Sequence, residues 1–274
     1  MSPAPTSDVA VLLGREPAST RERPVLVYRD GATGERTELS ATELGGWAAR
    51  TAALLVDGCR AAEPVGAAPS QRSRVGKGAR AAVLLPPHWQ TAAVLLGAWS
   101  AGVAVEFRPW ATAGIAPALP GLLDAVFVSR ARLDSWLEAV PAARHRFVLG
   151  LGPAGSAGQP TTPEGYRDYL AEVARYPDAP PAYRSIGQDD TASPDGTSYR
   201  EWAGIAQGIA DSMGLRAGDR LLVDAGRHEQ PVAWLLAPLV VGASVVLCGN
   251  LDTDALDTDA LDAVIREEGV THVL

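Results

Sequence analysis

One residue of this chain can supply a side-chain ammonium, because Lys77 is the only lysine among its 24 basic residues. Chemistry that needs a positioned ammonium or a Schiff base therefore has a single candidate. Lys77 lies in Arg74–Gly78, where Gly-Lys is followed by Gly instead of the Ser or Thr of a nucleotide-binding loop. We interpret this segment as a loop. The chain also lacks a Ser-His-Asp order, a nucleophile elbow and a dinucleotide fingerprint, so we assign no catalytic residue.

The histidines and aspartates do not predict a metal site. His145 and His272 are isolated from other metal-ligand residue types at the usual spacings. Leu251–Ala255 is followed by the same five residues at Leu256–Ala260, which places four Asp close together. The turn Gly and the terminal Glu of a calcium loop are missing from their positions. We interpret the duplication as the start of a helix, where Asp is favourable, and expect no metal.

An internal repeat is the strongest pattern in the sequence. Arg80–Val105 matches Arg220–Val245 without gaps at a constant offset of 140, with nine of 26 positions identical. The identical positions are Arg80/Arg220, Val83/Val223, His88/His228, Gln90/Gln230, Ala93/Ala233, Leu95/Leu235, Leu96/Leu236, Gly102/Gly242 and Val105/Val245. A capping box precedes each copy, at Ser40–Glu43 and Ser198–Glu201, and predicts a helix start.

Each half therefore predicts the order helix, strand, helix, strand, and strands joined through a helix run parallel. The expected fold class is α/β, with two pseudo-repeated helix-strand-helix-strand subdomains and mainly parallel sheets. The first helices of the halves are expected at Thr42–Val56 and Arg200–Met213. Further expected elements are a hairpin of Val25–Arg29 and Arg36–Leu39, strands at Ala125–Ser129, Arg146–Gly150 and Val270–Leu274, and helices at Arg132–Val140, Glu164–Ala174 and Asp257–Glu268.

The domain organisation follows from composition. We expect an N-terminal extension at 1–23, a first α/β subdomain at 24–176 and a second, shortened one at 177–274. The Pro-rich stretch Pro177–Pro181 marks the boundary between the subdomains. The segment Arg60–Gly78 has no periodicity and is expected to be a mobile surface loop.

Composition excludes several functional classes. A content of 47% apolar residues can form a core, and a net charge of −8 argues against nucleic acid as a partner. The uncharged stretches Ala81–Val105 and Pro231–Asn250 are interrupted by prolines, so we interpret them as buried elements and expect no membrane span. No signal peptide is evident, and Cys59 and Cys248 are expected to be buried free thiols of a cytoplasmic protein.

Several short motifs, in their order, resemble the start of the adenylate-forming (AMP-binding) superfamily of acyl-CoA synthetases and adenylation domains. The matching segments are Ser100–Pro109, Gly214–Arg220 and Pro238–Leu247. The resemblance extends from about Pro24 to Leu274 and covers only the first part of the family's large N-terminal domain. It implies a truncated version of that α/β domain and a short, degenerate relative of the family.

The resemblance also implies where a phosphate-binding loop belongs. Family members join a carboxylate to the ATP α-phosphate and hold the phosphates with a Gly/Ser/Thr-rich loop that ends in Pro-Lys-Gly. The corresponding residues here are Ser193, Pro194, Asp195, Gly196, Thr197 and Ser198. Asp195 stands in place of the Lys, and unit charges 4 Å apart interact by roughly 4 kcal/mol at an effective dielectric of 20. This reversal predicts poor phosphate binding, and Lys77 is not expected to compensate because it lies in the inserted loop.

A second position carries over from the family. His228 falls near a position where a His or an aromatic residue lines the acyl and adenylate pocket. Arg227–Gln230 is equally typical of a helix start, and His88 repeats the histidine in the other half, which favours a structural role. The family's acidic metal-binding motif, its ribose-binding Asp and its C-terminal lid with the catalytic Lys are absent from this sequence.

These features predict a degenerate AMP-binding-enzyme-like protein that lacks complete adenylation activity, acts as a binding or interaction module and needs no cofactor. The alternative is an acyl-CoA synthetase-like ligase remnant that binds an acyl-adenylate or a nucleotide, uses ATP and Mg²⁺ and is completed by a partner chain. A third hypothesis is a fragment of a longer enzyme. An unfinished sheet leaves an edge and an apolar face to cover, so we expect a homodimer or a protein partner through the second subdomain.

Overall fold

The computed structural model describes residues 24–59, 75, 77–115, 117, 120–135, 137, 139–154, 161–178, 186–250 and 258–274, with the side chains of 258–260 excepted. The expected N-terminal extension at 1–23 lies outside the described residues. So do most of the segment 60–78 and the first part of the duplicated Asp-rich segment, 251–257.

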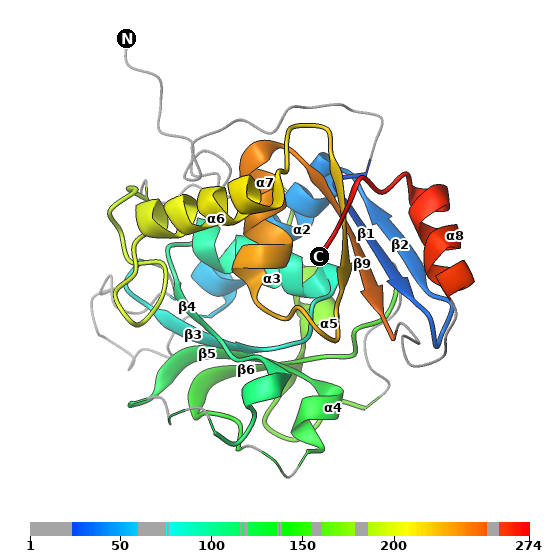
Figure 1. Ribbon diagram of the computed structural model, residues 1–274. Coiled ribbons are helices and arrows are strands. Elements are labelled where there is room, and N and C mark those ends of the chain that lie inside the picture. The colour runs from blue at the N-terminus through cyan, green and yellow to red at the C-terminus, as the bar shows by residue number, and fades with distance from the viewer. Residues whose placement is uncertain are drawn as a thin grey trace, which may run out of the picture.

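Two five-stranded sheets form the framework (Figure 1). The first sheet has the order β4 (Ala104–Phe107), β3 (Arg80–Leu84), β5 (Leu123–Ser129), β6 (Ala143–Leu149) and β7 (Arg167–Asp168), and all its pairs are parallel. The second sheet has the order β10 (His272–Val273), β8 (Arg220–Asp224), β9 (Ser244–Gly249), β1 (Leu26–Asp30) and β2 (Arg36–Leu39), and only β1 and β2 are antiparallel. The expected α/β class with mainly parallel sheets is confirmed.

Helices fill the space between the sheets and cover their outer sides (Figure 1). The helical segments are α2 (Ala41–Ala53), which continues into a π-helical turn at Leu54–Gly58, α3 (Trp89–Ser100), a 3₁₀ turn at Trp110–Thr112, α4 (Arg130–Leu133), α5 (Tyr169–Val173), α6 (Tyr199–Met213), a π-helical turn at Val232–Leu236, α7 (Ala237–Val241) and α8 (Thr258–Glu268). None of the described helices is long and apolar enough to cross a membrane.

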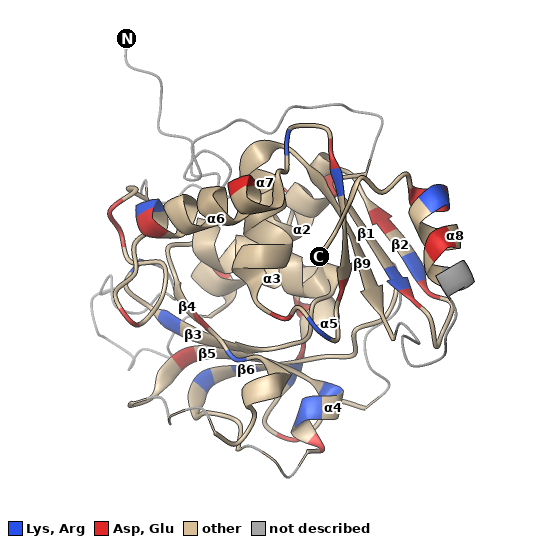
Figure 2. Cartoon of the chain, in the orientation of Figure 1, with Lys and Arg blue, Asp and Glu red and all other residues tan. Residues whose placement is uncertain are grey.

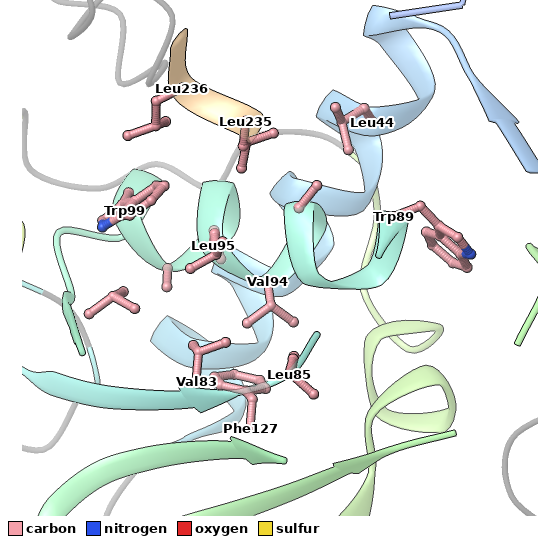
Figure 3. Packing of buried hydrophobic residues seen from close by; sticks show 14 of the residues in the cluster. Leu44, Val83, Leu85, Trp89, Val94, Leu95, Trp99, Phe127, Leu235 and Leu236 are labelled. Atoms are coloured by element: carbon pink, nitrogen blue, oxygen red, sulfur yellow. The ribbon is translucent and has the colours of Figure 1, made fainter. Parts of the chain in front are cut away.

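One core joins both sheets. Its buried residues include Val83 and Phe127 from the first sheet and Val245 from the second. Figure 3 shows Leu95 of α3 between Val83 and Phe127 on one side and Leu235 on the other. The central helices therefore bury apolar residues on two opposite faces, which explains the continuously apolar sequence of α3.

The repeat is visible in the structure. Strand β8 lies 140 residues after β3, and each is followed by helix and a parallel strand, β9 or β4. Gly102 and Gly242 occupy equivalent left-handed positions before those strands, with φ of 75° and 77°. Both predicted capping boxes are confirmed, at the N-termini of α2 and α6.

The hairpin β1–β2 crosses the expected domain organisation. It lies in the segment 24–176, yet β1 pairs with β9 of the segment 177–274. The two segments therefore share the second sheet.

The outer face of the second sheet is covered by α8. Val27, Leu222 and Val246 of the sheet pack against Val264 and Ile265 of this helix. The apolar face that we expected to be uncovered is therefore closed within the described residues, and the exposed large apolar residues described in the segment 177–274 are Ile205 and Val273.

Two predicted helices are wrong in extent. The helix expected at Arg132–Val140 is the single turn α4, which ends at Leu133. Arg132 is buried there, and its guanidinium donates to the backbone oxygens of Arg108 and Pro109. These tertiary contacts, rather than a helical periodicity, hold the segment.

The helix expected at Glu164–Ala174 begins later. Gly165 adopts a left-handed conformation with φ of 76°, and Arg167–Asp168 pairs with β6 as strand β7. Asp168 then caps α5, because its carboxylate accepts a hydrogen bond from Ala171 N at 2.8 Å. The helix starts at this cap rather than at Glu164, four positions earlier.

Candidate functional site

The residues of the predicted phosphate-loop position lie together in one tight turn. Thr191 and Ser198 form an antiparallel bridge at its base. The backbone oxygen of Ala192 accepts hydrogen bonds from Val105 N of β4 at 2.9 Å and from the Trp99 indole at 3.2 Å. The turn Ser193–Ser198 is therefore held between the edge of the first sheet and the start of α6.

The backbone donors of this turn have acceptors within the chain. Ala192 N and Ser193 N donate to the Thr197 oxygen at 2.8 and 3.2 Å, and Gly196 N donates to the Ser193 oxygen at 3.0 Å. Phosphate-binding loops work because several N–H groups point at the ligand. These three N–H groups point at backbone carbonyls instead.

The first turn of α6 is satisfied in the same way. Ser198 N donates to the Glu201 carboxylate at 2.7 Å, and the Ser198 hydroxyl accepts from Glu201 N at 3.3 Å. Tyr199 N and Arg200 N donate to the backbone oxygens of Asp190 and Gln188 at 3.1 and 2.8 Å. The helix start, normally an attractive place for an anion, uses the chain's own acceptors.

Asp195 lies inside the turn. Its carboxylate accepts hydrogen bonds from the Ser193 hydroxyl at 2.5 Å and from Thr197 N at 3.0 Å. The hydrogen bond from Ser193, followed by that from Thr197, lowers the pKa of Asp195. The turn thus contains a stabilised negative charge that is bound to the hydroxyl and amide donors nearest to it.

The helix that borders the turn adds to this electrostatic environment. Besides the bond from Trp99 to Ala192, the Tyr199 hydroxyl donates to the Trp99 backbone oxygen at 2.8 Å. Trp99 lies in the last turn of α3, where the backbone carbonyls carry the negative end of the helix dipole. A polyanion next to Ala192 and Tyr199 meets that negative end.

Lys77 lies next to this segment, contrary to the expectation that its loop keeps it away. Its ammonium is 2.8 Å from the Asp190 carboxylate, which also accepts from Gly187 N at 2.7 Å. Burial alone raises the pKa of Asp190, but the hydrogen bonds from Lys77 and Gly187 outweigh burial and lower it. The one lysine of the chain is therefore paired with a carboxylate just before the turn.

The internal repeat indicates where Lys77 lies relative to the neighbouring strand. Lys77 is equivalent to Ala217 at the offset of 140, and each precedes a strand that starts at an Arg. A Cβ atom built on Gly102 would lie 3.1 Å from the Lys77 Cα, and one built on Gly242 would lie 3.6 Å from the Ala217 Cβ. Both residues lie against the glycine before the neighbouring parallel strand.

The two equivalent histidines have different surroundings. His88 is buried at the N-cap of α3, where its Nδ1 accepts from Gln90 N at 3.1 Å. Its ring meets Tyr28 edge-on at 4.2 Å, and its Nε2 lies 3.8 Å from the Glu35 carboxylate. His228 is half-buried after β8, and its backbone N–H donates to the Asp224 oxygen at 3.0 Å.

Glu229, a residue that sequence analysis missed, joins the ends of β4 and β8. Its carboxylate accepts from Trp110 N at 2.5 Å and Ala111 N at 2.9 Å, in the 3₁₀ turn that follows β4. Ligands of α/β proteins commonly bind outside the carboxyl ends of parallel strands. That rule points to the neighbourhood of His228 and Glu229, but no local motif marks Glu229.

The remaining reactive residue types are the other carboxylates, the histidines and the two cysteines. In the part of the chain that the structure describes, no group of three or more His, Cys, Asp and Glu residues could hold a metal ion. Cys59 and Cys248 are buried free thiols, as expected. Burial raises the pKa of each thiol to about 11, so neither is a nucleophilic thiolate at neutral pH.

Solved structures share this fold. An acyl-CoA synthetase from Brucella canis superposes with a TM-score of 0.64 at 19% identity and covers 97% of this chain. The acetoacetyl-CoA synthetase from Streptomyces lividans gives 0.63 at 19% identity and covers 97%, and VinN gives 0.59 at 19% and covers 98%. This chain spans 46%, 42% and 61% of the lengths of these proteins, in that order.

The fold is therefore that of the N-terminal portion of acyl-CoA synthetases and adenylation domains, and the resemblance stated from the sequence is confirmed. No protein-family model matches the chain. A TIGR03089 family protein from Mycobacterium tuberculosis strain H37Rv is 35% identical over 257 residues, which are 92% of this chain and 91% of the relative. The chain belongs to the TIGR03089 protein family.

Proposed function

We propose that this protein uses the adenylate-forming fold without adenylating a substrate and acts as a binding or interaction module with a protein partner. The observation that carries the proposal is the turn Ser193–Ser198. Its backbone donors have acceptors within the chain, and Asp195 supplies an internal anion. The residues present do not fit a triphosphate, and no cofactor is expected.

Electrostatics and hydrogen bonding support the same conclusion. A phosphate at this turn would have to displace acceptors from at least three N–H groups and approach the Asp195 carboxylate. Both changes cost free energy, because the N–H groups and their present acceptors lose hydrogen bonds and like charges repel. The carbonyl end of α3 adds a further unfavourable interaction.

The proposal is tested by thermal unfolding with ATP and Mg²⁺. A ligand that binds only the folded state at 100 times its dissociation constant stabilises that state by about 2.7 kcal/mol, which corresponds to several degrees. We expect no shift of the unfolding midpoint for the wild type. A reproducible rise would contradict the proposal.

A pair of matched variants then localises any binding. Asp195→Asn removes the negative charge from the turn, and Asp211→Asn removes one from the exposed side of α6. If ATP binds at the turn, only Asp195→Asn strengthens the shift. Equal effects of the two variants would place the nucleotide elsewhere.

One observation favours a second candidate function, a ligase remnant that binds an acyl-adenylate or a nucleotide and is completed by a partner chain. The Lys77 side chain is 52% exposed, and its ammonium reaches the segment just before the turn. A cation there could pair with a phosphate that replaces Asp190. ATP and Mg²⁺ are ligands only under this alternative.

The alternative predicts stabilisation by AMP or by a non-hydrolysable acyl-sulfamoyl adenosine, and loss of that stabilisation in Lys77→Met. Arg200→Met is the matched control, because Arg200 also forms a 2.9 Å ion pair with an aspartate of the segment, Asp189. No stabilisation by either compound, or an equal loss in the two variants, would exclude the role of Lys77.

A further inference from the structure

Strand β2 forms an open edge of the second sheet. It is the last strand in the order β10-β8-β9-β1-β2, and its one strand neighbour in the described chain is β1. Asp30 N donates to the Glu35 oxygen at 2.9 Å, and Tyr28 is paired with Thr37 two positions further along the ladder. Since hydrogen-bonded pairs alternate in antiparallel ladders, the backbone groups of Thr37 point toward β1.

The same alternation directs the backbone N–H and C=O groups of Arg36 and Glu38 away from β1, toward the open edge. Their side chains are 40% and 47% exposed and form an ion pair of 2.5 Å with each other. Figure 2 shows basic and acidic residues along β2. Opposite charges thus flank Thr37 symmetrically along an edge that can still form hydrogen bonds.

We propose that this edge binds a second copy of the chain, in an antiparallel β2–β2 contact with its two-fold axis at Thr37. In that register Arg36 lies opposite Glu38 of the partner subunit, and Glu38 lies opposite Arg36 of the partner subunit. Both positions are hydrogen-bonding pairs, because their backbone groups point outward. Each symmetric contact forms twice, which is the property of an isologous interface.

Charge complementarity selects a copy of this chain over an unrelated partner. Opposite charges directly across an antiparallel pair are favourable, and like charges are unfavourable. An edge that carried one sign of charge would repel its own copy, which is a common protection against aggregation. The alternation of Arg36 and Glu38 around Thr37 is instead complementary to itself.

The inference goes beyond the proposed function and is independent of whether the turn Ser193–Ser198 binds ATP. It gives the expected homodimer a location on the sheet that contains the strands of the second half. A four-residue edge forms a small interface, so the dimer is expected to be weak and dependent on concentration.

The test is sedimentation velocity over a hundredfold range of concentration. The wild type is expected to shift from the 28.6 kDa of one chain toward twice that mass as concentration rises. Glu38→Arg places arginines opposite each other across the axis and should weaken the dimer at least tenfold. Asp262→Arg, the same change on the exposed side of α8, is the control and should leave the dimer unchanged.

A second variant tests the backbone part of the contact. Glu38→Pro removes an outward N–H that β1 does not use, a substitution that edge strands tolerate. It should also weaken the dimer at least tenfold, and thermal unfolding checks that it folds. If the Glu38→Pro variant does not fold, the result for Glu38→Arg alone tests the proposal.

Two results would overturn the proposal. One is a wild-type protein that stays monomeric at every concentration. The other is a dimer whose dissociation constant is the same in Glu38→Arg as in the wild type, because the contact would then lie elsewhere. Loss of the dimer in Glu38→Arg with retention in Asp262→Arg supports it.

Discussion

The Lys77 ammonium lies 2.8 Å from the Asp190 carboxylate and connects the segment before β3 to the turn before α6. Half of the Lys77 side chain is exposed, and exposed ion pairs contribute about 0–1 kcal/mol. The position of this pair therefore matters more for what can bind nearby than for stability.

Substituting Lys77 or Asp190 measures how much this ion pair contributes to stability. We expect Lys77→Met to lower the free energy of unfolding by less than about 1 kcal/mol, measured by urea denaturation. Asp190→Asn should cost more, because it also removes the charge from the acceptor of the hydrogen bond from Gly187 N. A larger loss in Lys77→Met than in Asp190→Asn would show that the ammonium has contacts of greater structural importance.

A buried carboxylate provides a much stronger prediction. The Glu268 side chain is 2% exposed and accepts hydrogen bonds from Arg29, Arg36 and Arg220 at 2.9–3.1 Å. Burial raises the pKa of Glu268, but the arginines, with Arg36 first, outweigh burial and lower it. The carboxylate is thus ionised and holds the end of α8 on the second sheet.

Glu268→Gln leaves three guanidinium groups without their shared anion. We expect a loss of roughly 3 kcal/mol in unfolding free energy, the lower end of the range for a broken buried ion pair, because Arg29 and Arg36 are partly exposed. The control is Glu267→Gln, which removes a 58% exposed partner of Arg29 and should cost less than about 1 kcal/mol. Equal losses in the two variants would contradict the role given to burial.

Much of the framework could be predicted because it depends on local signals. Capping boxes begin α2 and α6, and Gly102 and Gly242 precede the next strands, so the boundaries of these elements are encoded within a few residues. The apolar composition of α3 follows from burial on two sides. Such signals can be recognised without knowing which distant segment packs against the element.

The contacts that the sequence did not predict join segments far apart in the chain. Glu229 binds a turn 118 positions earlier, and β1 pairs with β9, which follows it by more than 200 residues. The helix predicted at Arg132–Val140 is a single turn, in which Arg132 donates hydrogen bonds to backbone oxygens after β4. For the candidate site, the order of residues located the turn, whereas the neighbourhood of Lys77 followed from the repeat only once the strand order was known.

Close packing of α2 and α3 predicts that a larger residue at Gly97 destabilises the fold. A Cβ atom at Gly97 would lie 2.5 Å from the Thr51 Cβ and 2.6 Å from the Ala48 backbone oxygen. Gly97→Ala should therefore lower the free energy of unfolding by about 1–3 kcal/mol, the usual cost of overpacking. The Ala48 oxygen belongs to the helix backbone, so a change of side-chain rotamer cannot relieve the clash.

Gly208 is the matched control in a helix interior. A Cβ atom there meets nothing within 4 Å in the described structure, and Ala is a better helix former than Gly. Gly208→Ala should raise the free energy of unfolding by about 0.5–1 kcal/mol in urea denaturation. Destabilisation by Gly208→Ala would indicate a contact with atoms outside the described residues.

His88 gives the fold a dependence on pH. Its ring is 1% exposed, and burial lowers its pKa more than Glu35 and Asp30 raise it. The unfolded chain therefore binds a proton near pH 6.5 that the folded chain does not, and stability is lost as the pH falls below that value. Above pH 6.5 both states are neutral at this residue and the contribution is fully present.

Asn is a good N-cap residue without a titrating ring, so His88→Asn separates capping from protonation. Between pH 6.5 and 5 the wild type should lose up to about 1.4 kcal/mol of unfolding free energy per pH unit more than the variant. Urea denaturation of both proteins at pH 7.5, 6 and 5 measures the difference, in which the titration of the carboxylates cancels. The variant can be less stable at every pH because the smaller side chain leaves a cavity, but parallel pH profiles would show that His88 stays protonated on folding.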